Sequence, residues 1–179
     1  MKNIILIAII ILTFFISCRK STLKITEPED SFFLDKMKGG DYTNGDGKDS
    51  FKVSNDGKNI TIGSNNYTFE SDIMGIGGIY QDTNSSNYVG VFPIGGSMHT
   101  VSMSKEQKEA VTKIIDVVGK ENSLNVIKEL SNGNGGKLDT EAITKNLDDK
   151  KKEEVKKIIE GYKLDGKDFG KYEKYEKKT

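Results

Sequence analysis

The 179-residue sequence contains no tryptophan, two prolines, one histidine and one cysteine. A single cysteine cannot form an internal disulfide, and a single histidine, His99, excludes a metal site built from several imidazoles. Lysine plus arginine and aspartate plus glutamate both number 27, so the formal net charge is zero. Because no basic face with interleaved aromatic residues is present, we expect no nucleic-acid partner.

The first apolar run of the chain has the length of a signal peptide. Residues 1–3 supply a short positive start, and residues 4–16 are apolar except for Thr13. A membrane-spanning helix requires about 20 apolar residues, and Arg19 and Lys20 follow this run almost at once. The sequence therefore predicts a cleaved export signal over residues 1–17 and disfavours the alternative, an uncleaved anchor helix.

The end of this run carries the only cysteine. Phe15-Ile16-Ser17-Cys18 resembles the bacterial lipobox, in which a large apolar residue, a small or β-branched residue and Gly, Ala or Ser precede an invariant cysteine. Phe15 departs from the usual leucine. The resemblance implies cleavage before Cys18, diacylglycerol on its sulfur and an acyl chain such as palmitate on its amine. Each buried CH₂ contributes about 0.8 kcal/mol, so two or three chains would anchor the protein to a membrane almost permanently.

The overall composition extends this resemblance. A bias towards lysine, asparagine and isoleucine, the absence of tryptophan and the relaxed lipobox resemble the plasmid-encoded outer-surface lipoproteins of Borrelia spirochaetes, without indicating a subfamily. Several families in that group bind host complement regulators or matrix proteins. The resemblance implies a location on the outer membrane, at the cell surface, and a non-enzymatic virulence role in adhesion or immune evasion through a host extracellular protein.

The part of the chain after Cys18 begins with polar residues 18–30, which predict a flexible tether. Residues 29–37 favour one short helix. In residues 50–71, apolar and polar side chains alternate in three short runs separated by Asn/Gly turns, as expected of antiparallel strands covered on one face. Further strands are predicted at 76–81, 88–94 and 99–103. Residues 31–103 are therefore predicted to form a small antiparallel β-sheet. We expect its strands to follow one another as a meander, and a barrel-like arrangement is the alternative.

The pattern changes from period two to helical spacing at Ser104. Residues 104–107 form a capping box, an apolar stripe follows at helical spacing, and Gly119 ends the helix. Three more short helices are predicted around residues 123–130, 139–147 and 148–162. The fold class is therefore α+β, with a β-rich N-terminal half, a helical region over 104–164 and a loose charged tail over 165–179.

Residues 41–49 are the one candidate for a metal site. Asp41, Asn44, Asp46 and Asp49 supply oxygen ligands near a glycine, in partial agreement with calcium-binding loops. The first and twelfth positions of the EF-hand pattern would be a tyrosine and a valine, which are not ligands. The favoured interpretation is an Asn/Gly turn before a strand, and a calcium-stabilised domain is the alternative.

No motif indicates catalysis or a cofactor, and we expect neither. The glycines in residues 73–78 have the wrong spacing for a dinucleotide fingerprint, and His99 lies outside any nucleophile motif. The charged segments 150–157 and 171–178 predict solvated surfaces, with a host-ligand contact as the alternative for the tyrosine-bearing tail. Three functions remain: a binding protein for a host protein, a structural or envelope-maintenance lipoprotein, and an envelope hydrolase, which has almost no residue support.

Overall fold

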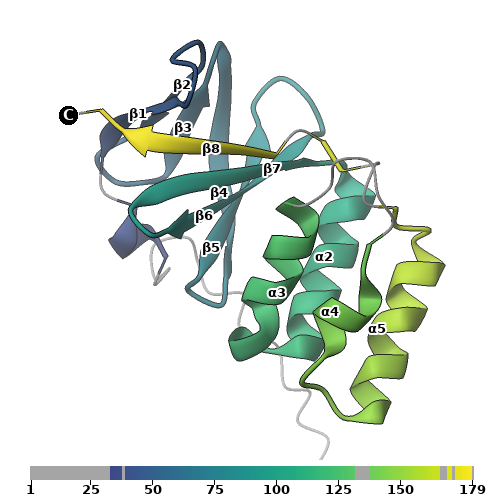
Figure 1. The fold of residues 1–179 in the computed structure, drawn as a ribbon. Coiled ribbons are helices and arrows are strands. Elements are labelled where there is room, and N and C mark those ends of the chain that lie inside the picture. Colours follow the sequence, from purple (N-terminus) through teal and green to yellow (C-terminus); the bar gives the residue numbers. More distant parts are fainter. Residues whose placement is uncertain (1–32, 38, 132–137, 166–168, 171, 179) are drawn as a thin grey trace, which may run out of the picture.

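An eight-stranded antiparallel β-barrel with four helices on one side makes up the computed structural model, which confirms the α+β class (Figure 1). The predicted signal peptide, the tether and Cys18 lie outside the described residues. The described residues are 33–37, 39–131, 138–165, 169–170 and 172–178.

The sheet is a closed barrel rather than a small open meander. Each strand pairs with its neighbour in sequence, and the last strand pairs with both β7 and β1. Closure leaves no strand edge unpaired. The strands are β1 (Gly40–Asn44), β2 (Ser50–Val53), β3 (Asn59–Ile62), β4 (Asn65–Ile73), β5 (Gly77–Asp82), β6 (Tyr88–Ile94), β7 (Ser97–Met103) and β8 (Tyr172–Lys177).

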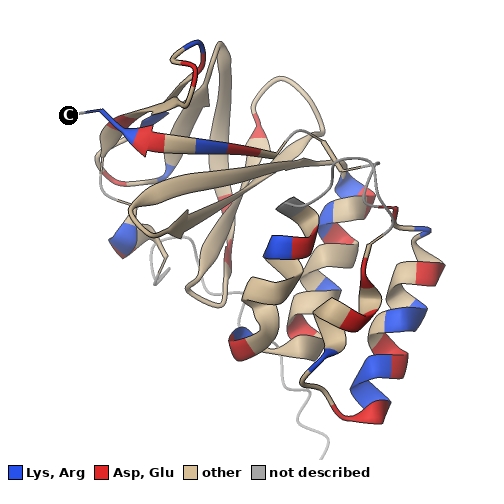
Figure 2. Ribbon diagram, viewed as in Figure 1, with Lys and Arg blue, Asp and Glu red and all other residues tan. Residues whose placement is uncertain are grey.

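The prediction of a loose tail over 165–179 is wrong, because β8 closes the barrel. Tyr175 is fully buried inside it, and the exposed residues of β8 alternate in charge (Figure 2). The sequence also fails to predict β1 as a strand. Its single buried residue, Tyr42, gives too weak an alternation to recognise.

Strand alternation divides the apolar side chains between two cores. One fills the barrel interior and contains Phe51, Phe69, Tyr80 and Tyr175. The other lies between the outer face of β5–β7 and the helices, where residues such as Val101 contact the helical apolar stripes. The helices thus cover one side of the barrel wall and leave its two ends uncovered by helix (Figure 1).

The four predicted helices are present, and their caps explain where they begin. They are α2 (Lys105–Val118), α3 (Lys120–Ser131), α4 (Thr140–Thr144) and α5 (Asp149–Gly161). Ser104 caps α2 through the predicted capping box, in which its amide donates to Gln107 Oε1 at 2.7 Å. Asp139 and Asp148 cap α4 and α5. Within the described ranges, none of the helices combines the length and apolarity needed to cross a membrane.

Residues 33–37 close one end of the barrel. Only a single 3-10 turn, Leu34–Lys36 (η2), forms where a short helix is predicted. The Phe33 ring stacks on Phe69 with centroids 6.2 Å apart and lies edge-on to Tyr80 at 6.4 Å. Its amide donates to Asp72 Oδ2 at 2.8 Å. We call this the closed end; the turns β1–β2 and β3–β4 and the loop β5–β6 lie at the opposite end, which we call the mouth (Figure 1).

Candidate functional site

The predicted calcium loop is a hairpin turn between β1 and β2. Asp41 lies on the outer face of β1, opposite Lys52. Asn44 Oδ1 accepts the Asp49 amide at 3.1 Å, and Asp46 Oδ1 accepts the Lys48 amide at 3.1 Å. The Asp46–Lys48 hydrogen bond is an Asx turn, and the Asn44–Asp49 hydrogen bond spans the hairpin turn, which agrees with the favoured sequence interpretation.

The four candidate metal ligands do not converge on one point. In the described part of the chain, no three His, Cys, Asp or Glu side chains are grouped so as to hold a metal ion. Asp49 instead lies at the barrel mouth and lines a cavity there.

His99 lies on the outer face of β7, where the neighbouring strand determines its environment. Its Nδ1 contacts the Tyr172 hydroxyl, and Lys174 is its cross-strand partner. Burial lowers the pKa of His99, and the Lys174 charge lowers it further. Thr100, the next residue, faces the opposite side of the sheet, so the two do not form a nucleophile–base pair.

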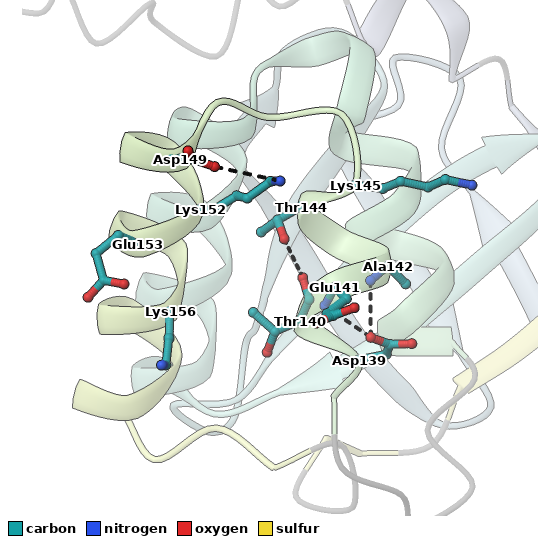
Figure 3. Close-up of a pocket in the computed structure, with 10 residues that line it drawn as sticks. All are labelled: Asp139, Thr140, Glu141, Ala142, Thr144, Lys145, Asp149, Lys152, Glu153 and Lys156. Atoms are coloured by element: carbon teal, nitrogen blue, oxygen red, sulfur yellow. Dashed lines mark hydrogen bonds and ion pairs between the residues drawn. The ribbon is translucent and has the colours of Figure 1, made fainter.

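An open groove of about 740 Å³ lies between α4 and α5 (Figure 3). Its polar groups already serve the helices: the Asp139 carboxylate accepts the Glu141 and Ala142 amides, each at 3.0 Å. Acidic and basic side chains alternate along its α5 wall, as Figure 2 shows for the whole helix. The groove thus presents the solvated surface predicted for 150–157, with no concentration of one charge.

The barrel mouth holds a smaller pocket of about 380 Å³ with a different lining. Tyr67, Thr100, Ser102 and Glu173 line it from three strands, and Asp49 from the β1–β2 turn. A second pocket of about 320 Å³ shares Tyr67 and Ser102 and extends to the start of α2. The two pockets together form the candidate site at the end of the barrel that residues 33–37 leave open.

Strand register brings these distant residues together. Thr100 lies directly opposite Glu173 across β7 and β8, and Tyr67 lies opposite Asp82 across β4 and β5. One step deeper, the Tyr175 ring packs on Phe51 with centroids 5.3 Å apart, and its hydroxyl contacts Glu173. The floor of the mouth is therefore aromatic and its rim is polar.

Acidic groups dominate the electrostatics of the mouth. Burial raises the pKa of Tyr67, and the Asp82 carboxylate raises it further. The pKa of Tyr175 is raised by burial first, then by its hydrogen bond to Glu173 and by the charge of Asp49. Both phenols therefore stay protonated at neutral pH. Among the described residues that line the two pockets, three are carboxylates and none is lysine or arginine.

Thr100 presents a hydroxyl to this pocket. Its side chain is only 3% exposed and lines the cavity. No other described residue forms a hydrogen bond with this hydroxyl. Because no described side-chain oxygen or nitrogen is both fully buried and unpartnered, the Thr100 oxygen is reached from the cavity. It is a polar group in place for a ligand.

No protein-family model matches the chain, and comparisons with curated proteins and with solved structures find no significant match. The site must therefore be interpreted from its own residues. Of the four described residues predicted as metal ligands, only Asp49 lines the mouth. The alternation in residues 50–71 indicates that Tyr67 faces inward, but nothing in the sequence indicates which residues of β7 and β8 lie beside it.

Proposed function

We propose that this chain is a lipid-anchored, non-enzymatic binding protein on the outer surface of a bacterium, and that the barrel mouth binds a host extracellular protein. The lipobox-like end of the signal peptide, with Cys18 as the lipidated residue, supports the anchor. The polar pocket at the mouth supports a binding role, since clefts of a few hundred Å³ with few convergent polar groups are typical ligand sites.

The position at which the chain enters the barrel carries this proposal. Phe33, the first described residue, is packed at the closed end. An anchor attached through the preceding residues therefore joins the domain opposite the mouth. Attachment at this end leaves the mouth accessible to an external ligand, as a surface receptor requires.

The few exposed apolar side chains fit the same orientation. In the described part of the chain, three large apolar residues are more than a third exposed: Met74, Ile94 and Leu124. Met74 lies in the β4–β5 turn and Ile94 is the last residue of β6, so both are at the closed end, the side nearest the proposed anchor. A broad apolar docking face is not formed by these residues, so the polar mouth is the better candidate for partner recognition.

Two measurements on intact cells that express the full chain test the proposal. Protease added outside should remove the protein from intact cells, whereas the Cys18→Ser variant should lose its membrane association. Cells carrying the wild-type protein should retain a host protein from serum or matrix extract, and cells carrying Tyr67→Ala should retain less. Thr61→Ala, on the outer face of the adjacent β3, is the matched control.

Protection from external protease until the envelope is broken would contradict a surface role and favour the structural or envelope-maintenance alternative. Retention of no host protein by wild-type cells would contradict the binding role. Equal retention by wild-type and Tyr67→Ala cells would place the binding surface elsewhere on the domain.

A further inference from the structure

We propose that the barrel mouth binds a primary ammonium group, carried by a free alkylamine or by the end of a lysine side chain. This inference rests on the proposed role of the mouth as the binding site and names the chemistry that the site takes. It follows from the charge, the aromatic floor and the hydroxyl groups of the pocket.

The charge of the lining selects for a cation. Asp49 and Glu173 line the main pocket, and Asp82 lines its extension. No lysine or arginine among the described residues lines either pocket. Burial raises the pKa values of the two phenols first, and Asp82 near Tyr67 and Glu173 and Asp49 near Tyr175 raise them further, so the carboxylate charges act inside the mouth. An anion would meet repulsion there, whereas an ammonium group would be attracted.

The shape of the lining selects for an organic cation rather than a bare metal ion. The carboxylates are too dispersed to form a three-ligand metal cluster in the described residues, and the pocket of about 380 Å³ is much larger than an ion. The Tyr67 ring offers a face for a cation–π contact. Ile62, which also lines the pocket, offers an apolar surface for an alkyl chain.

The hydroxyl groups complete the site. A primary ammonium has three N–H donors and no acceptor, so it requires three oxygen acceptors around one point. Thr100 and Glu173 are cross-strand partners and both line the pocket, as does Ser102 on the same strand as Thr100. The accessible Thr100 oxygen and the Glu173 carboxylate thus provide neutral and charged acceptors side by side.

Titration of the full-length protein with n-butylammonium chloride at low salt, followed by NMR shifts or calorimetry, tests the inference. We expect saturable binding that 1-butanol, the neutral analogue, does not reproduce. Glu173→Gln should weaken binding about tenfold, the effect expected for removal of one close charge in a partly buried site. Glu176→Gln, on the opposite face of β8, should leave binding unchanged.

Additional variants separate loss of binding from loss of folding. Tyr67→Phe keeps the ring and should bind as the wild type does, whereas Tyr67→Leu should bind more weakly. Asp49→Asn provides a second charge removal if Glu173→Gln does not fold, and it keeps the Asp49 amide that donates to Asn44 Oδ1. Circular dichroism of each variant checks that the barrel is intact.

Two further probes distinguish the source of the ammonium. Tighter binding of spermidine than of a short lysine-containing peptide would indicate free amines, and the reverse would indicate a protein lysine; either supports the inference. The inference is overturned if n-butylammonium shows no saturable response, or if Glu176→Gln weakens binding as much as Glu173→Gln does. Host-protein retention that depends on Tyr67 in the absence of ammonium binding would leave the proposed function intact and refute only this chemistry.

Discussion

Substitution of Phe33 by alanine tests whether residues 33–37 close the barrel. Phe33 is fully buried, with its ring against Phe69 and Tyr80. Removal of the ring leaves a cavity and exposes the barrel core at the closed end. Phe→Ala changes in such surroundings cost about 3–5 kcal/mol, through lost transfer energy and the unfilled cavity.

This loss is large compared with the total stability of a domain, which is about 5–15 kcal/mol. Phe33→Ala should therefore remain folded but unfold at clearly lower urea concentration, with an unchanged slope of free energy against denaturant. Phe33→Leu should lose less, because leucine fills part of the space. Leu124→Ala is the matched surface control, since Leu124 is 44% exposed, and it should change stability by at most about 0.5 kcal/mol.

Urea denaturation followed by circular dichroism measures all three variants in the full chain. If Phe33→Ala lowers the free energy of unfolding by less than about 1 kcal/mol, no more than the exposed control does, the packing of Phe33 in the barrel is refuted. An anchor attached before Phe33 would then no longer be expected to join the domain opposite the mouth.

Two other perturbations examine the helical half and the outer barrel face. Ser104→Ala removes the capping box of α2 and should lower the free energy of unfolding by about 1 kcal/mol in the same assay, whereas Ser104→Asp should restore most of it. The pKa of His99 is lowered in the folded state by burial and by Lys174, so folding favours its neutral form. The resulting contribution of His99 to the free energy of unfolding is fully present above the unfolded pKa of about 6.5. It is lost as pH falls towards the lower pKa of the folded state. Between pH 7.5 and 5, the free energy of unfolding should therefore decrease less in His99→Gln than in the wild type. Identical pH profiles for the two proteins would contradict this.

Short sequence patterns predict those helices and strands whose own residues favour the structure that they adopt. The capping box, the helical apolar stripe and the alternation in residues 50–71 correspond to α2, β2, β3 and the start of β4. The caps Asp139 and Asp148 also lie where the sequence indicates. In these segments, the secondary structure that the residues prefer is also the one that the tertiary environment requires. A pattern of a few residues is therefore sufficient to predict the element.

The two strands that close the barrel could not be predicted in this way. β8 has the sequence Tyr-Glu-Lys-Tyr-Glu-Lys, in which only Tyr175 is buried, and its stability comes from pairing with β7 and β1. Strand preference depends on such neighbours more than on the residues themselves. The mouth was missed for the same reason, because Asp49, Tyr67, Thr100 and Glu173 meet only through register.

The pairing of β1 with β8 joins the beginning and the end of the described chain, and this imposes an order on folding. The barrel cannot close until the C-terminal residues have been synthesised and released, so β1 and β7 retain open edges for most of that time. Contacts between distant segments form slowly, because the entropy of a long loop must be overcome first. A nascent or truncated chain that lacks β8 would expose two pairing-competent edges and tend to associate with other copies. The β8 segment therefore determines whether the barrel closes at all.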